Sequence, residues 1–516
     1  MPVRFEIHPA IGIARVGTSD QHFIFDGQNS TTTSRRDATA DRKMLRQAAE
    51  FRVYKCTRDA AGKLQAADEI STTGATINWS VHVANRKATA PRFLSRGSGR
   101  RNGATGDDNH DRKLIIDAGE QNVTNPGEIK NLSGSFGTRP VTLGKITAGP
   151  TGRLIFVGGD GTAASPTNQP IGNFADNDGW FDTISDGVVR ARVTPSGGQP
   201  ADALPAWVVT APPDYAPGIM NLVTLYDVLL DTAIKRGVLR PPQQVVFSRH
   251  IKPILQRAMA YQWVTRAAHD GYADSLSGGH SAGGPGDFAS SMAQLGDPAA
   301  PNTDRARIFH FFRDPDSPAH APNHTSMPRL SDDDDSGDVF TLTRTQYSAM
   351  LQWSQGKFVT DAPPDAESEP EALTRMALEA CAGGPFFPGI EAGRIMREVA
   401  RYMNDEPFRL SPDAVKPGEI TQNNAVPWQA DFQLCRWEET DGRAIKRLGW
   451  WPAQRPDDVL KTKDADPVPW TRGISDTFSG MIDNWHRLGF VKEDPANPGV
   501  FIEQDRDQKL PDVGIV

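Results

Sequence analysis

Apolar and polar residues alternate in several short stretches of the first 210 residues. In residues 76–83 every second side chain is apolar, namely Ile77, Trp79, Val81 and Val83. This spacing would place the four side chains on one face of a β-strand. Further apolar runs, between clusters of Gly, Asn, Asp and Pro, lie at residues 11–16, 114–116 and 154–157. Such a pattern is typical of strands joined by turns, and it predicts a β-rich N-terminal part with long loops.

After residue 211 the spacing becomes helical. Apolar side chains at intervals of three and four predict a helix over residues 219–236, and Gly237 is a natural stop. Further helices are predicted at residues 249–270, 343–355, 369–380, 390–403 and 474–488. We therefore expect an α+β protein with two domains, a β-rich one at residues 1–210 and a mainly α-helical one at residues 211–516.

Composition and charge narrow the function classes. The 516 residues include 47 glycines and 40 prolines, and the formal net charge is −8. A mildly acidic chain has no bulk attraction for nucleic acid or for an anionic membrane, so we expect neither as a partner. No apolar run reaches the roughly 18 residues of a membrane helix. The first residues lack the pattern of a secretory signal, which predicts a protein that is cytoplasmic at synthesis, with non-classical export as an open possibility.

No metal site is predicted from the spacing of ligand residues. The three cysteines, Cys56, Cys381 and Cys435, show no C-x-x-C spacing, and we expect Cys56 and Cys381 to be small buried side chains. His320 and His324 stand four apart, but prolines surround them, and the four aspartates at residues 332–335 read as a solvated charge cluster. The segment DNDGWFD, residues 176–182, lacks the register of a calcium loop, and it is predicted to form a hairpin with its turn at Asp178 and Gly179.

The C-terminal third holds an unusual cluster of residues. Four tryptophans crowd around Cys435 in the sequence, namely Trp428, Trp437, Trp450 and Trp451. Asp431 precedes Cys435 by four residues, so on a helix the two side chains would share a face. A carboxylate beside a thiol raises the pKa of that thiol, which does not suit a thiolate nucleophile. The same carboxylate suits a base that takes a proton from a thiol or an indole. A tryptophan-rich core with a buried thiol is the alternative interpretation.

Around these residues the chain resembles the LodA-like oxidases, a family of amino-acid oxidases that includes lysine ε-oxidase and glycine oxidase. The similar segments occur in order along nearly the whole chain: IHPAIGIARVGTS, GRLIFVGG, NDGWFDTISDG, APPDYAP, TLYD, LTRTQYSAMLQWSQGKF, GGPFFPGIEAGRIMR, PWQADFQLC and WWPAQRPDDV. In this family a cysteine sulfur is bonded to an oxidised tryptophan, which forms cysteine tryptophylquinone.

The resemblance implies a site and a cofactor. Carried over residue by residue, the cysteine is Cys435, the tryptophan is Trp450 or Trp451, and Asp431 is the aspartate needed for maturation and the best candidate for the catalytic base. Tyr226 and His486 are weaker candidates for lining the substrate site. The chain is shorter than the best-known members and lacks a large insertion of lysine ε-oxidase, so the substrate does not carry over.

The implied reaction is the oxidative deamination of a primary amine, either a lysine ε-amine or a glycine-like α-amine. Dioxygen is the co-substrate, and ammonia and hydrogen peroxide are released. The resemblance also implies a LodB-like flavoprotein that matures the cofactor, with its FAD held by that partner and none in this chain, and a homo-oligomer. Two alternatives stay open: a member without the cofactor that acts as a binding or scaffold protein, and a quinoprotein that acts on a peptide or protein amine.

Overall fold

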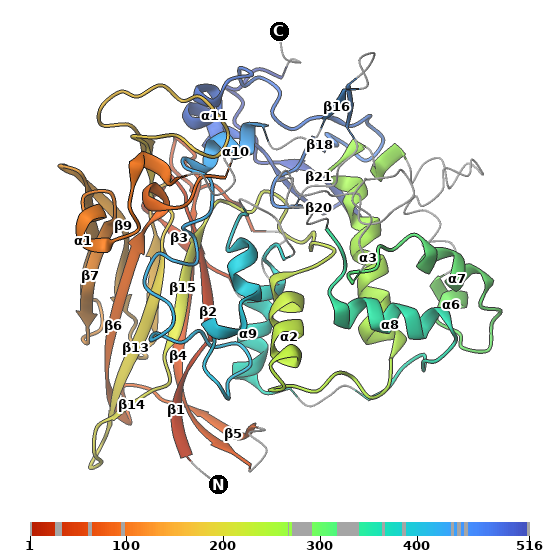
Figure 1. Ribbon diagram of the computed structural model, residues 1–516, viewed down its shortest axis with the longest axis horizontal. Coiled ribbons are helices and arrows are strands. Elements are labelled where there is room, and N and C mark those ends of the chain that lie inside the picture. The colour runs from red at the N-terminus through yellow and green to blue at the C-terminus, as the bar shows by residue number, and fades with distance from the viewer. Residues whose placement is uncertain are drawn as a thin grey trace.

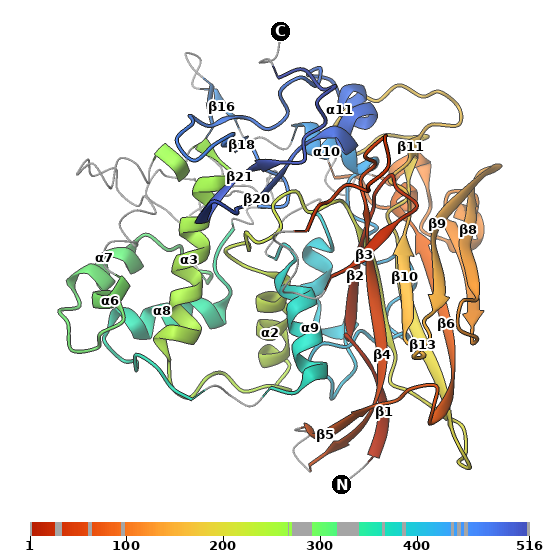
Figure 2. The ribbon, with the colours of Figure 1, turned by 180° about the vertical axis from the view of Figure 1, so that it is seen from behind.

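A twisted β-sheet forms one side of the molecule and helices cover one of its faces (Figures 1 and 2). The computed structural model describes residues 3–25, 33–59, 64–93, 99–266, 268–270, 292–316, 340–363, 367–383, 389–434, 438–440, 445–447 and 452–512. Within this part of the chain no helix is long and apolar enough to cross a membrane.

The sheet has 13 strands among the described residues. They are β1 (Val3–His8), β2 (Ile11–Arg15), β3 (His22–Ile24), β4 (Arg46–Arg58), β5 (Leu64–Glu69), β6 (Ala75–Asn85), β7 (Ile116–Val123), β8 (Ile129–Phe136), β9 (Arg139–Ala148), β10 (Leu154–Gly158), β13 (Asp186–Pro195), β14 (Ala201–Asp202) and β15 (Ala206–Ala211). The main order is β7-β6-β13-β15-β2-β4-β10-β9-β8, with β1, β3 and β5 paired to β4 and β14 paired to β13. Most pairs are antiparallel, whereas β2 runs parallel to β15, and β3 parallel to β4.

The sheet curls until its two ends meet. Strands β7 and β8 stand at opposite ends of the order, yet they lie against each other. At this contact a Cβ on Gly134 would come within 2.6 Å of the carbonyl oxygen of Asp117, so a residue with no side chain is required there. The curled sheet encloses an apolar core, to which β6 contributes Ile77, Trp79, Val81 and Val83, each at most 3% exposed. The predicted face of this strand is confirmed.

Helices follow the sheet in the chain. They are α2 (Leu225–Lys235), α3 (Lys252–Ala260), α6 (Met292–Leu295), α7 (Thr303–His310), α8 (Arg344–Ser354), α9 (Glu369–Glu379), α10 (Trp428–Leu434) and α11 (Phe478–Asn484); α1 (Asp108–Asp111) is a single turn earlier in the chain. Helix α9 lies against β1 and β2, α2 packs beside α9, and a second apolar core fills the space between sheet and helices. The α+β prediction, with a β-rich first part and a later helical part, is confirmed.

Three of the predicted helices are present; α8 and α9 form close to their predicted bounds, whereas α2 begins six residues later than predicted. Helix α2 begins at a capping box of Thr224 and Asp227 and ends before Gly237, whose φ of 76° is the left-handed conformation that glycine favours. Thr343 and Gln346 form the same box at the start of α8, and Ser368 does so with Glu371 at the start of α9.

Three other helix predictions are wrong in part or in full. Residues 390–403 form only two short 3₁₀ turns, Gly393–Arg397 and Val399–Arg401, because Glu391 is buried and binds Arg15 and the amide of Ala382. The helix predicted from residue 249 is divided into a π-turn (Phe247–Ile251), α3, and a 3₁₀ turn (Tyr261–Trp263). The helix predicted at residues 474–488 is shortened to α11 and the turn Trp485–Arg487.

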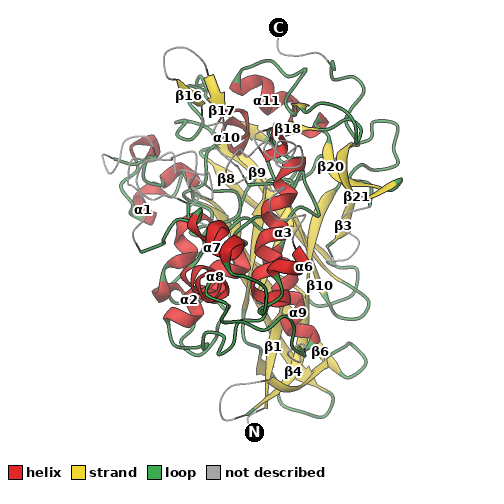
Figure 3. Cartoon of the chain, turned by 90° about the vertical axis from the view of Figure 1, so that its right-hand side faces the viewer, coloured by secondary structure: helices red, strands yellow, loops and turns green. Residues whose placement is uncertain are grey.

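Small two-stranded sheets lie outside the main sheet in the described part of the chain (Figure 3). The pairs are β11 (Ala163–Ala164) with β12 (Phe181–Asp182), β16 (Glu438–Thr440) with β17 (Ile445–Arg447), β18 (Asp458–Val459) with β19 (Val468–Pro469), and β20 (Phe490–Asp494) with β21 (Asn497–Gln504). All but the first belong to the C-terminal part of the chain.

Candidate active site

Helix α10 carries the predicted base, Asp431. The helix covers Trp428–Leu434, so Asp431 lies one turn before the position of Cys435, and its side chain is 6% exposed. Cys435, Trp450 and Trp451 themselves lie outside the described residues. The site is therefore built from the segments that lead into and out of these three positions.

A buried ion pair lies beneath the first residue of α10. The ammonium group of Lys87 is 2.7 Å from Oδ2 of Asp182, and both side chains are fully buried. The same carboxylate oxygen accepts the backbone N–H of Trp428 at 3.1 Å, and Lys87 donates to the carbonyl oxygen of Ala425 at 2.8 Å. Burial lowers the pKa of Lys87, while Asp182 and, more weakly, Asp431 act to raise it. The pair thus fixes the chain on both sides of residue 427.

A second buried pair holds the segment that precedes α10. Arg101 Nε is 2.7 Å from Asp176 Oδ1, and Arg101 donates to the carbonyl oxygens of Lys87 and Asn424 at 3.1 and 2.9 Å. Asp176 also pairs through its backbone with Val426. The predicted turn at Asp178 and Gly179 exists, but the predicted hairpin around it is wrong, because Asp176 takes its partner from near α10.

Aromatic side chains surround the other side of α10. The ring of Trp428 meets those of Phe432 and Trp485 edge-on, with centroids 4.9 and 5.2 Å apart. Tyr215 lies near Phe432, stacks on Phe490 and donates its hydroxyl to the carbonyl oxygen of Trp485 at 2.8 Å. Burial raises the pKa of Tyr215 well above its ordinary value, so the phenol stays neutral in this apolar packing.

The segment that follows Trp451 packs directly against α10. Residues 452–460 are all buried, and Nε of Arg455 donates to the carbonyl oxygen of Phe432 at 3.0 Å. Asn221 anchors the same segment, because it accepts the N–H of Ala453 and donates to Gln454, both at 2.9 Å. A hydrogen bond thus joins Phe432, three positions before Cys435, to Arg455, four positions after Trp451.

Tyr226 and His486 occupy different surroundings. The ring of Tyr226, on α2, packs against Phe408 at 5.3 Å, and burial raises its pKa to about 12. His486 is half-buried beside Trp485, whose ring touches Trp428 of α10, and burial lowers the pKa of His486. His486 is therefore separated from α10 by one aromatic ring, whereas Tyr226 packs against Phe408. Their predicted role in lining the site stays a prediction.

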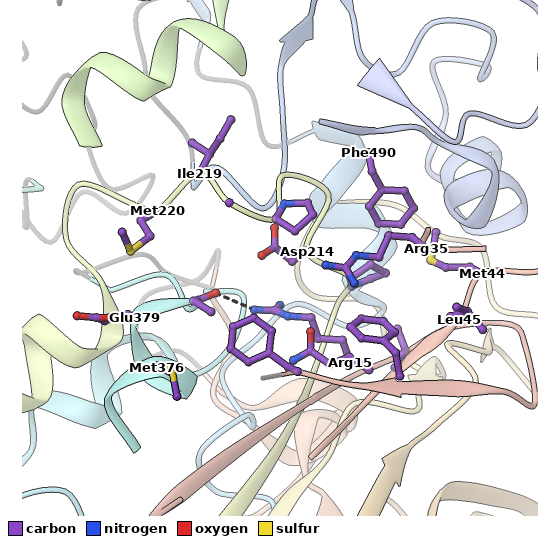
Figure 4. Close-up of a pocket in the computed structure, with 18 of the residues that line it drawn as sticks. Arg15, Arg35, Met44, Leu45, Asp214, Ile219, Met220, Met376, Glu379 and Phe490 are labelled. Atoms are coloured by element: carbon purple, nitrogen blue, oxygen red, sulfur yellow. Dashed lines mark hydrogen bonds between the residues drawn. The ribbon is translucent and has the colours of Figure 1, made fainter. Parts of the chain in front are cut away.

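A cavity of about 400 Å³ lies between α9, strands β2 and β3 and residues 213–220 (Figure 4). Its lining includes Arg15, Arg35, Asp214 and Glu379, together with apolar side chains such as Phe23 and Ile219. The carbonyl oxygen of Ala380, in the cavity wall, accepts from Arg15 at 3.1 Å and from Gln454 at 3.2 Å. The cavity thus shares a wall with the segment that follows Trp451.

The two described cysteines are buried and carry free thiols, as predicted. Cys56 lies close to Glu6 and His8, a combination of ligand types that could hold a metal ion. Arg58 and Arg409, however, already lie 2.7 and 3.5 Å from the Glu6 carboxylate, and this positive charge opposes a cation. His320, His324 and the aspartates at residues 332–335 lie outside the described residues.

Comparison with known proteins defines the family. The model of the L-lysine epsilon oxidase N-terminal domain matches residues 8–210, and that of the C-terminal domain matches residues 323–451. Because the two matches together cover more than half of the chain, this protein belongs to the LodA-like family of oxidases. It is 24% identical to L-lysine 6-oxidase from Marinomonas mediterranea, over 98% of this chain and 90% of the relative.

Solved structures share the fold. The crystal structure of the L-Lys epsilon-oxidase from Marinomonas mediterranea matches with a TM-score of 0.77 and 23% identity, over 98% of this chain and 95% of that one. A structure of the Schiff base intermediate of that enzyme with L-Lys matches equally well, with a TM-score of 0.77, 22% identity and the same coverage.

Proposed function

We propose that this protein is an oxidase that deaminates a primary amine of an amino acid, using cysteine tryptophylquinone formed from Cys435 and Trp450 or Trp451. The observation that carries the proposal is the buried Asp431 on α10, one turn before Cys435, beside a segment that returns from Trp451 and is bonded to the same helix. Family membership supports the chemistry, and the lysine substrate of the similar enzyme supports an amino-acid substrate.

Each part of the chain has a role in this proposal. The quinone supplies an electrophilic carbonyl pair that accepts a primary amine and then two electrons. Asp431 takes a proton from the carbon that bears the amine, and such a positioned base contributes roughly 10² to 10⁴ in rate. The aromatic side chains around Trp428 exclude water. In the overall reaction the amine, dioxygen and water would give a carbonyl product, ammonia and hydrogen peroxide.

The cavity beside Ala380 is our candidate for the substrate pocket. Its lining carries guanidinium and carboxylate groups, which complement the carboxylate and the ammonium group of an amino acid. Arg35 is 4% exposed, and its guanidinium lies over the ring of Phe23, 4.3 Å from the ring centroid. Such a planar donor group suits a carboxylate. A lysine-like and a glycine-like amino acid both meet this description.

Maturation requires a partner in this proposal. Oxygen insertion and crosslinking need a redox cofactor, and we propose that a separate flavoprotein supplies it, as the family resemblance implies. A homo-oligomer is proposed on the same basis.

The decisive experiment compares the chain expressed alone with the chain expressed together with the flavoprotein encoded beside it. We expect co-expressed protein to gain two oxygens and lose four hydrogens by intact mass, to absorb visible light, and to release peroxide with an amino acid. Cys435 should then resist alkylation. A colourless protein with an alkylatable Cys435 after co-expression would contradict the quinone and favour a binding or scaffold role. Peroxide release with peptide amines alone would favour a peptide substrate.

A matched pair of variants tests the pocket. Arg35→Met should lower kcat/KM for lysine or glycine roughly 10- to 100-fold but leave the corresponding amines, cadaverine or methylamine, little changed, because one carboxylate contact is lost. Arg375→Met is the control, since Arg375 also lines the cavity but is already bound by Glu367 and Glu379 at 2.8 Å. Equal losses with amino acids and with amines would exclude Arg35 as the carboxylate site.

A further inference from the structure

The buried ion pair of Lys87 and Asp182 beneath α10 has a role beyond anchoring the helix. We infer that Lys87 and Asp182 are positioning residues for Asp431: Lys87 places a buried positive charge beneath the helix that carries the base, and Asp182 fixes the first residue of that helix. The inference rests on the proposed role of Asp431 as the base.

The geometry of Lys87 supports a charge that is held in place. Its ammonium group is fully buried, 2.7 Å from Asp182 and 2.8 Å from the carbonyl oxygen of Ala425. Its backbone is fixed as well, because the N–H of Lys87 donates to Asn85 Oδ1 at 3.0 Å and its carbonyl accepts from Arg101. A buried lysine tends to lose its proton unless anions compensate. Asp182 is the main anion near it, and Asp431 is another.

The carboxylate of Asp182 accepts several hydrogen bonds. Besides Lys87, its carboxylate accepts the N–H of Trp428 and Ile184, both at 3.1 Å, and Nδ2 of Asn85 at the same distance. Because Trp428 is the first residue of α10 and Asp431 is one turn further, any shift of Asp182 moves the helix on which the base sits. The pair therefore couples the position of the base to a fixed positive charge.

Other charged groups also border α10. On the sheet side they are Lys87, Asp182, Arg101 and Asp176; on the C-terminal side they are Arg455, Asp457, Asp476 and His486. In this set Arg101 pairs with Asp176 and Arg455 with Asp457, as Lys87 does with Asp182. The charges that act most on Arg101 are those of Asp176, Asp182 and Arg92, which makes Arg101 a matched control cation.

The experiment measures the proton affinity of Asp431 directly. The Asp431 carboxyl band is titrated in the unmodified chain by infrared difference spectroscopy, with the spectrum of the Asp431→Asn variant subtracted. In a second measurement the pH profile of kcat/KM is recorded on the mature enzyme, and its acid limb is compared between variants. In Lys87→Met the titration of Asp431 and the acid limb should both move to higher pH by roughly one unit or more, because a nearby cation is lost. Lys87→Arg should stay within a few tenths of a unit of the wild type, and Arg101→Met should do so too.

Asp182→Asn gives a second test if Lys87→Met does not fold. This variant keeps the lysine and removes an anion, so the titration of Asp431 should move to lower pH. An unchanged Asp431 titration in Asp182→Asn and in any folded Lys87→Met would overturn the inference, and so would an equal shift in Arg101→Met. A shifted infrared titration in a chain that forms no quinone would support the inference and count against the proposed function instead.

Discussion

The two sides of helix α10 are held by different interactions. On the sheet side two buried ion pairs, Lys87 with Asp182 and Arg101 with Asp176, bind the chain that leads into the helix. On the C-terminal side the described contacts are aromatic, around Trp428, together with a hydrogen bond to the helix from Arg455, which is itself paired with Asp457. In our inference the Lys87–Asp182 pair of the charged side acts on Asp431, whereas the aromatic side shapes the site.

This division has an energetic consequence. Removing one partner of a buried ion pair leaves an uncompensated charge, which costs far more than trimming a well-packed ring contact. The aromatic side spreads its stabilisation over many weak contacts, so each one tolerates change. We therefore expect a single substitution to lower the free energy of unfolding more on the charged side than on the aromatic side.

The largest expected effect is at Asp431, between the two sides. Asp431→Asn should fold but lose the quinone and reduce the rate of amine oxidation by at least about 10²-fold, because the base is lost while the shape is kept. Absorbance, intact mass and peroxide release measure this. Asp476→Asn is the control, since the exposed Asp476 also contacts α10, through Gln433, and should behave as the wild type. Normal quinone content in Asp431→Asn would remove Asp431 from maturation.

The next effect tests how strongly the stability of the protein depends on the ion pair between Lys87 and Asp182. Lys87→Met should lower the free energy of unfolding by about 3–5 kcal/mol, because it leaves Asp182 buried without its cation. The double variant Lys87→Met with Asp182→Asn should recover a large part of this loss, since neither charge is then left alone. Urea unfolding measures both. A double variant that is less stable than Lys87→Met would show that the hydrogen bonds of Asp182 matter more than its charge.

The sequence predicted local elements better than it predicted the charged side of α10. Local spacing was enough to indicate the face of β6 and the helices α2, α8 and α9. It also indicated that Asp431 and Cys435 would share a helix face, and the helix is present up to Leu434. All of these depend on residues close together in the chain.

The ion pairs could not be predicted in this way. Lys87 is 95 positions from Asp182, and Arg101 is 75 positions from Asp176. Both cations stand in polar stretches that resemble exposed loops, and nothing in their neighbours indicates burial. One signal was present, because the similar segment NDGWFDTISDG contains Asp182, but its spacing was interpreted as a hairpin. Which residues a loop covers depends on the tertiary fold.

A smaller effect is the pH dependence of stability that the buried Asp186, on the sheet side, should cause. Burial raises the pKa of Asp186 from 3.8 to about 6, although its carboxylate accepts bonds from Trp207 and Thr421. Between about pH 4 and 6 the folded chain therefore holds a proton that the unfolded chain has released, so stability from this group falls as pH rises through that window. The loss should reach up to about 3 kcal/mol.

Unfolding of the wild type and of Asp186→Asn across this pH range isolates the contribution of Asp186. The difference between the two curves should decrease as pH rises from about 4 to about 6 and be flat above it. A difference that rises with pH would mean that the hydrogen bonds outweigh burial and hold the carboxylate ionised.

The smallest effect concerns the hydroxyl hydrogen bond of Tyr215 in the aromatic cluster beside α10. Tyr215→Phe removes the hydroxyl that donates to the carbonyl oxygen of Trp485 but keeps the ring that stacks on Phe490. We expect a loss of about 1 kcal/mol in the free energy of unfolding and a change in kcat/KM of less than about twofold, because α10 keeps its packing and its ion pairs. A loss as large as that of Lys87→Met would mean that this side also depends on a single buried polar contact, and the contrast between the two sides of the helix would fail.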